Sequence, residues 1–259
     1  MKQFLATAVA TAISLGLSSN ALAGGDHHGH IKSEANTKVA SEFDLTHAKV
    51  VKNAASLTFQ AEVTDKLGQT KPKAIGKLGG SEVYSYVWPT NLDSEVVGFE
   101  KGQGILALAV TSHPDFDDTP KFDENLDGDK ANDGNEWHSH WVVLTKDESC
   151  GGGLKVKDIP EGQQPKMPAT WPGLPIYIDS PGYTPEFVKN EVTVEVPTKD
   201  LSFQEDFQFD AVTAVLQVND SVHNPLLCVT AVNDVASGDL SLPGKVVAQH
   251  PAKATANKG

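Results

Sequence analysis

Arginine is missing from this 259-residue chain, and all 21 of its basic residues are lysine. Planar, bidentate clamping of carboxylates and phosphates is a property of the arginine guanidinium. A dedicated phosphate-binding enzyme is therefore disfavoured. The chain also carries 34 acidic residues, which gives a formal net charge of -13. This balance disfavours nucleic acid and anionic membranes as partners and favours metal ions, while a protein partner stays unknown.

Long apolar stretches are also missing beyond residue 23. None approaches the ~18 residues that a transmembrane helix needs, so membrane insertion is not expected. The apolar run Phe4–Leu17 follows Lys2 and precedes Ala21-Leu22-Ala23, which is the arrangement of a secretory signal peptide. We expect residues 1–23 to be that signal peptide. The mature protein would then be periplasmic or secreted.

Cysteine is scarce, with only Cys150 and Cys228 in the chain. An even number of cysteines in an exported protein predicts a disulfide bond. A bond that closes a loop of roughly 77 residues contributes about 4 kcal/mol when it is treated as a loop-closure restraint. The alternative, a thiolate metal pair, is disfavoured because neither cysteine lies in a CxxC or CxxH motif.

Common catalytic signatures are missing as well. The chain has no GxSxG, P-loop, GxGxxG or HExxH motif, and no CxxCH motif for covalent haem. Aromatic residues such as Trp88 and Trp171 would be able to line a ligand groove, but in an all-β fold they are more often part of the core.

The residues that are present predict an all-β fold. Segment 57–63 alternates apolar and polar residues, as does segment 191–196, and short strands of this kind separated by Gly, Pro and Asn turns favour an antiparallel β-sandwich. We expect one domain at 41–236, with an acidic loop at 113–136 and an ordered Pro-rich loop at 160–185. A disordered, His-bearing tail is expected at 24–40 and a flexible tail at 237–259.

Two of these strand patterns, Phe43-Asp-Leu45 and Leu57-Thr-Phe-Gln-Ala-Glu-Val63, resemble those of ligand-binding sandwiches of the DOMON type. The resemblance implies an Ig-like or DOMON-like architecture. It identifies no site residue.

The most informative stretch runs from His113 to Trp141. It contains seven Asp, two Glu and three His in 29 residues. Its segment Asp123-Glu-Asn-Leu-Asp-Gly128 resembles the opening of an EF-hand loop and the free-standing DxDxDG calcium loops of extracellular proteins. The resemblance implies a Ca²⁺ site in which Asp133 or Glu136 closes the ligand set of Asp123, Asn125, Asp127 and Asp129. The alternative is a solvated acidic loop that binds no ion.

Histidines stand at both ends of this loop. His138 and His140 are two residues apart on an expected strand, so they share a face. If strands 104–112 and 137–145 form a hairpin, His113 lies beside them. These three histidines and one carboxylate, from Glu136 or Asp115, would suit Zn²⁺, Cu²⁺, Fe or Ni²⁺. The alternative is that the histidines only hydrogen-bond loop carboxylates.

Other histidines add weaker possibilities. His223 would join this cluster if the disulfide draws the two regions together. His27, near the expected mature N-terminus, suggests a Cu²⁺- or Ni²⁺-binding arm.

The favoured interpretation is an exported, non-enzymatic metal-binding β-sandwich. It would hold Ca²⁺ in the acidic loop and possess a transition-metal site at the histidines. A metal-dependent periplasmic hydrolase or oxidoreductase that uses His113, His138 and His140 is the first alternative. A sandwich that binds non-covalent haem or carbohydrate is the second.

Overall fold

The computed structural model describes residues 29–116, 121–220 and 225–249. The expected signal peptide, His27 and His223 lie outside these residues. Within them, no helix is long and apolar enough to cross a membrane. The only helical segments described are two short 3-10 turns, η1 (Ser94–Val97) and η2 (Thr198–Leu201).

The first of two large sheets contains six strands in the order β1-β2-β3-β10-β9, with β15 beside β2. Apart from the parallel pair β2–β15, its neighbouring strands are antiparallel. Its strands are β1 (Ile31–Lys32), β2 (Leu45–Lys52), β3 (Ser56–Val63), β9 (Glu186–Val188), β10 (Glu191–Pro197) and β15 (Val247–Ala248).

The second sheet closes on itself. Strands β5, β4, β12, β13, β7 and β6 pair in that order, and β6 pairs again with β5, so the six form a closed barrel with β8 attached to β6. The strands are β4 (Glu82–Pro89), β5 (Ile105–Ser112), β6 (His138–Lys146), β7 (Leu154–Val156), β8 (Ile178–Asp179), β12 (Val212–Val218) and β13 (Leu227–Val235). A small separate sheet pairs β11 (Gln208–Phe209) with β14 (Gly244–Lys245).

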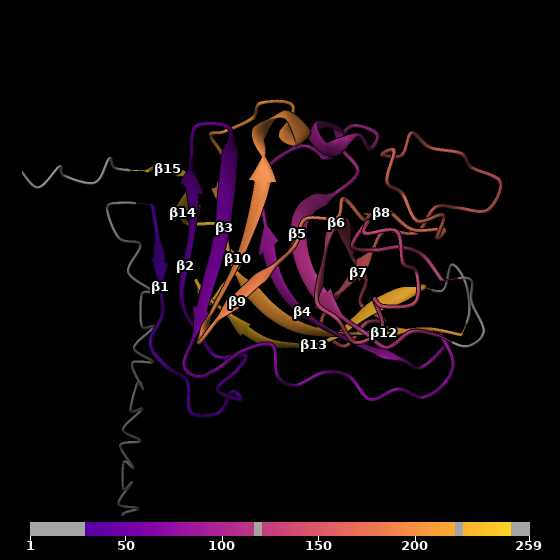
Figure 1. Cartoon of the computed structure of the whole chain (residues 1–259), viewed down its shortest axis with the longest axis horizontal. Helices are drawn as coiled ribbons and strands as arrows, with labels where there is room; N and C mark the ends of the chain where they lie inside the picture. Colours follow the sequence, from indigo (N-terminus) through magenta and orange to yellow (C-terminus); the bar gives the residue numbers. More distant parts are fainter. Residues whose placement is uncertain (1–28, 117–120, 221–224, 250–259) are drawn as a thin grey trace, which may run out of the picture.

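The first sheet packs against the outside of the barrel (Figure 1). Alternate residues of β4, β5 and β6 are therefore buried on two faces: one between the first sheet and the barrel, and one inside the barrel. In β5, Leu106, Leu108 and Val110 pack against the first sheet, whereas Ala107 and Ala109 face the barrel interior. This double burial explains why β5 is a continuous apolar run instead of an alternating strand.

The predictions of an all-β, antiparallel fold and of a disulfide bond are confirmed. The expectation of an antiparallel β-sandwich needs correction, because one of the two large sheets is a closed barrel. Periodicity indicates which faces of a strand are buried, but not whether the last strand of a sheet pairs with the first.

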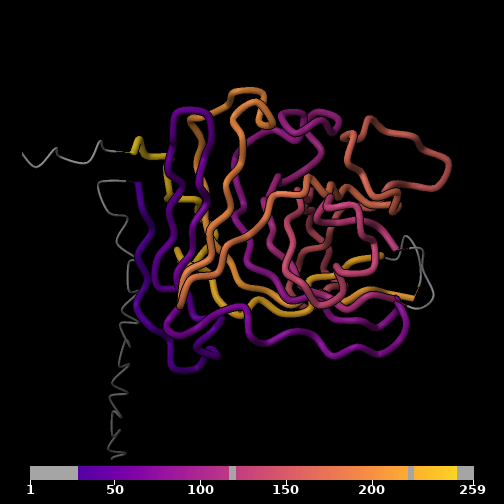
Figure 2. The backbone as a smooth tube through the Cα atoms, in the orientation of Figure 1, coloured from indigo at the N-terminus to yellow at the C-terminus, as the bar shows by residue number. Residues whose placement is uncertain are grey.

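Ordered structure also extends past the expected domain boundaries. Ile31 is buried at 1% exposure in a strand within the expected N-terminal tail, and β14 and β15 lie within the expected C-terminal tail. The Pro-rich segment 160–185 forms a loop at the side of the barrel away from the first sheet and then runs back toward β9 (Figure 2). Its residues Ile176, Tyr177 and Ile178 are buried.

Candidate metal centre

The acidic stretch is the loop of the hairpin that joins β5 to β6. The two strands pair in register, with Thr111 opposite His138 and Ala109 opposite His140. The loop is closed at its base, because the backbone N–H of Asn135 donates to the carbonyl of His113 at 2.9 Å. The predicted hairpin is therefore present, and it places all three histidines at one end of the barrel.

Four side chains converge there: His113, Glu124, His138 and His140. Each offers one ligand atom, and these four atoms all lie within 4.8 Å of one another. Glu124 is at the centre, with its Oε2 atom 3.4 Å from Nε2 of His113 and 3.3 Å from Nε2 of His138. We call these four residues the His/Glu cluster.

Backbone carbonyls orient two of the imidazoles. Nδ1 of His140 donates to the carbonyl of Asp179 at 3.2 Å, with the Ser180 hydroxyl 3.1 Å from the same nitrogen. Nδ1 of His113 donates to the carbonyl of Pro114 at 3.1 Å. A carbonyl only accepts, so each Nδ1 carries the proton and each neutral ring presents an unprotonated Nε2. This is the arrangement typical of metal-binding histidines.

The contact between His113 and Glu124 requires a proton or a metal ion between the two side chains. In a neutral His113 ring, the Nε2 lone pair faces the Glu124 carboxylate, so two hydrogen-bond acceptors meet with no proton between them. Either a proton or a metal ion resolves this contact. The Thr111 hydroxyl lies 3.3 Å from Nε2 of His138 and can donate one hydrogen bond there. It places no proton between His113 and Glu124.

The pKa shifts follow from the same burial and charges. Burial lowers the pKa of His138 to about 3 and that of His140 to about 4, despite the opposing effect of Glu124. Burial alone would lower the pKa of His113 as well, but the charges and hydrogen bonds of Glu124, Pro114 and Asp115 together raise it.

Burial alone would raise the pKa of the Glu124 carboxyl, but the three histidines together hold it well below its usual range. At neutral pH the cluster therefore contains one carboxylate and at least two neutral imidazoles. These are the protonation states that bind a metal ion.

The spacing suits a small transition-metal ion. Four ligand atoms at ~2.0–2.1 Å from a tetrahedral ion are about 3.4 Å apart. The two distances from Glu124 to His113 and His138 already have this value. Closing the remaining separations, which reach at most 4.8 Å, requires only small side-chain movements. Three imidazoles and a carboxylate fit Zn²⁺, Cu²⁺ or Fe.

The acidic loop lies directly against this cluster. Asp123 accepts hydrogen bonds from the backbone of Asp127 and Gly128, and Gly128 has a φ of 97°, in the left-handed region that favours glycine at a sharp turn. Asp133 is 1% exposed, and one of its oxygens accepts from the backbone N–H of Glu124 at 3.1 Å. Its other oxygen, Oδ1, is buried without a hydrogen-bond partner among the described residues.

Sequence reasoning missed Glu124 as the central carboxylate. Of the two expected acids, Glu136 is 64% exposed and pairs with Lys71, and Asp115 pairs with Lys121. No local pattern marked Glu124, because its position beside the histidines depends on how the loop folds back.

The predicted calcium ligands lie around the same turn but do not form a compact group of three carboxylates within the described residues. Comparisons with protein families, with curated proteins and with solved structures return no match for this chain. The candidate centre therefore rests on its own geometry.

Proposed function

We propose that this chain is an exported, non-enzymatic metal-binding protein that holds one transition-metal ion at the His/Glu cluster. One observation carries the proposal: three imidazoles and a carboxylate converge at metal-ligand spacing. Zn²⁺ matches this ligand set best, and Cu²⁺ and Fe are its competitors. The sequence features of a signal peptide support export.

The ligand count favours binding over catalysis. Structural zinc sites generally have four protein ligands, whereas catalytic zinc sites have three and keep one position open for water or substrate. With Glu124 included, the cluster supplies four. The enzyme alternative would require Glu124 to leave the ion and open a position.

The second alternative, haem or carbohydrate, gains little support. The cavity beside the cluster has a volume of about 130 Å³. Pockets that hold drug-sized ligands have volumes of roughly 300–1,000 Å³, so this cavity is smaller than such pockets.

We further propose that the acidic loop binds Ca²⁺. Asp123, Asn125, Asp127 and Asp129 supply oxygens at the spacing of a calcium loop. The unpartnered, buried Oδ1 of Asp133 supports a cation on this side of the turn. Since Asp133 also holds the backbone of Glu124, Ca²⁺ in the loop would steady the central ligand of the His/Glu cluster.

Zinc titration of matched variants tests the transition-metal site. Chelator-treated wild-type protein should bind stoichiometric Zn²⁺ in competition with a chromophoric chelator. E124Q keeps the shape of the side chain but removes its charge, and we expect its affinity to fall by at least about 10–100-fold, the loss typical of changing even an outer partner of a metal ligand.

E136Q is the matched control, because Glu136 is an exposed glutamate at the other end of the same loop. It should bind Zn²⁺ like the wild type. Any zinc held by histidines of the N-terminal segment is common to all three proteins and cancels in the comparison. Equal affinities for E124Q, E136Q and wild type would refute the site.

A further inference from the structure

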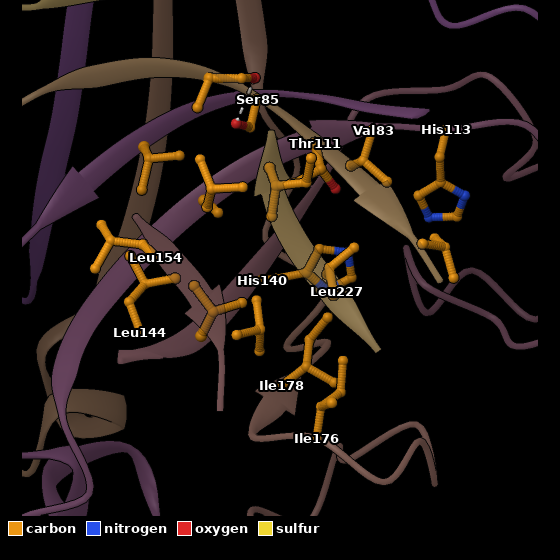
Figure 3. A pocket seen from close by; sticks show the side chains of 18 of the residues that line it. Val83, Ser85, Thr111, His113, His140, Leu144, Leu154, Ile176, Ile178 and Leu227 are labelled. Atoms are coloured by element: carbon orange, nitrogen blue, oxygen red, sulfur yellow. Dashed lines mark hydrogen bonds between the residues drawn. The ribbon is translucent and has the colours of Figure 1, made fainter. Parts of the chain in front are cut away.

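The interior of the barrel contains a partly open cavity of about 130 Å³ that reaches the His/Glu cluster. His113, Glu124 and His140 form part of its wall, and aliphatic side chains from β4, β5, β6, β7 and β12 form most of the rest. Figure 3 shows His113 and His140 toward one side of this space, with Leu144 and Leu154 toward the other. We call this space the lumen.

The lumen is unsuited to water. A buried water needs two to four polar partners, and the two hydroxyls on the wall are already engaged. Ser85 donates to the carbonyl of Ala214 at 2.9 Å (Figure 3). The Thr111 hydroxyl lies 3.3 Å from Nε2 of His138. Away from the cluster, the wall therefore offers a water molecule only the oxygen lone pairs of these two hydroxyls among the described residues.

Small alanines create this space. Ala109 of β5 and Ala214 of β12 line the interior at positions where larger residues would fill it. Apolar cavities of about 150 Å³ stay dry and accept molecules such as benzene or xenon. The lumen is of similar size, and away from the His/Glu cluster its lining is largely aliphatic.

We propose that the lumen is a binding site for a small, wholly apolar molecule about the size of toluene. The occupant would contact the aliphatic wall and lie beside the metal centre without supplying a ligand to it. This inference goes beyond the proposed metal binding and does not depend on it, because the alanine-lined space exists without an ion.

Toluene binding, followed by methyl NMR, tests the inference on both the metal-free and the Zn²⁺-loaded protein. Addition of toluene should shift the methyl signals of Ala214, Val142 and Leu216 in at least one of the two forms. The methyl signals of Val50 and Val194, which lie in the core between the two sheets, should stay in place. Absence of shifts at the lumen methyls in both forms would overturn the proposal.

Two substitutions locate the site. A214L places a larger side chain in the lumen and should weaken toluene binding at least tenfold, whereas A231L adds the same groups at an exposed position of β13 and should leave binding unchanged. L216A enlarges the lumen and should admit butylbenzene, which the wild type excludes. This second variant keeps the test decisive if A214L fails to fold. Equal toluene affinity in A214L and A231L would refute the lumen as the site.

The two proposals fail separately. Toluene binding by a protein that does not bind Zn²⁺ would refute the metal centre and support the lumen. Zinc binding without any toluene-induced shift would do the reverse.

Discussion

At the scale of single residues, the pKa of a buried acid depends on the groups that surround it. Glu124 lies beside three histidines. Asp210 is fully buried and accepts hydrogen bonds from the Ser237 hydroxyl and from two backbone N–H groups. The surroundings of Glu124 hold its pKa low, but those of Asp210 do not offset burial, which raises the pKa of Asp210. Burial alone therefore does not determine the charge of an acid in this fold.

The pH dependence of stability should reveal Asp210. Because its pKa is higher in the folded protein than in the unfolded chain, folding favours its protonated form. Its contribution to the free energy of unfolding is therefore greatest below the ordinary Asp pKa and declines as pH rises through the raised value. Relative to D210N, the wild type should lose stability over that window in urea titrations of the metal-free protein.

Asp239 provides a control of opposite sign. It also accepts from the Ser237 hydroxyl, but hydrogen bonds from Ser241 and Ser237 lower its pKa at an exposed position. Its stabilising contribution is present above the ordinary Asp pKa and is lost as pH falls through the lowered value. Parallel pH profiles for wild type and D210N would contradict this account.

At the scale of elements, the β5–β6 hairpin organises the site. Pairing of its strands places Thr111 opposite His138 and sets His140 at the same end of the barrel. Its loop folds back and places Glu124 beside the histidines. Neighbouring loop residues would therefore serve the two proposed sites: oxygens on one side of the turn for Ca²⁺ and Glu124 on the other for the transition metal. A loop of this kind contains few apolar contacts, so its order depends on hydrogen bonds and on any bound cation.

Calcium should stabilise this element. Saturating Ca²⁺ at about 100 times Kd contributes about 2.7 kcal/mol, which corresponds to a rise in Tm of about 5–10 °C for a chain of this size. D127N should lose most of this rise, because Asp127 is an expected ligand. Differential scanning calorimetry with CaCl₂ and then with excess chelator measures the effect.

D147N is the matched control for this experiment. Asp147 also accepts hydrogen bonds from a turn, here from Ser149, and lies outside the acidic loop. It should keep the full Ca²⁺ response. An unchanged Tm of the wild type on adding Ca²⁺ would count against the calcium site.

At the scale of the whole molecule, closure of the barrel and the disulfide bond link distant parts of the chain. Cys150 follows β6 and Cys228 lies in β13, with a sequence separation of 78 and a Cα–Cα distance of 5.4 Å. The bond thus connects the hairpin that carries the site to the far half of the barrel. It restrains a long loop in the unfolded chain.

Removal of this bond should destabilise the protein without dismantling the site. The double variant C150S/C228S should lose about 4 kcal/mol, or about 10 °C in Tm, measured under oxidising conditions. Its Zn²⁺ affinity at low temperature should match that of the wild type, because none of the four cluster residues contacts the bond. A Tm equal to that of the wild type would show that the disulfide bond does not stabilise the folded protein by restraining the unfolded chain.

Sequence alone determined the features that depend on local pattern and residue chemistry. Alternation in β3 and β10 indicated strands, paired cysteines indicated the disulfide, and an HxH pair next to an acidic loop indicated a cluster of histidines with one carboxylate. These predictions succeed because the period of a strand and the ligand preferences of side chains are properties of short segments.

Only the tertiary structure decided the rest. Whether β5 meets β6 to close a barrel depends on the accumulated twist and register of six strands. Whether Glu124 or Glu136 joins the histidines depends on how the loop folds back, which no short segment of the sequence determines. The lumen arises because Ala109 of β5 and Ala214 of β12 both line the barrel interior, although they lie far apart in the chain.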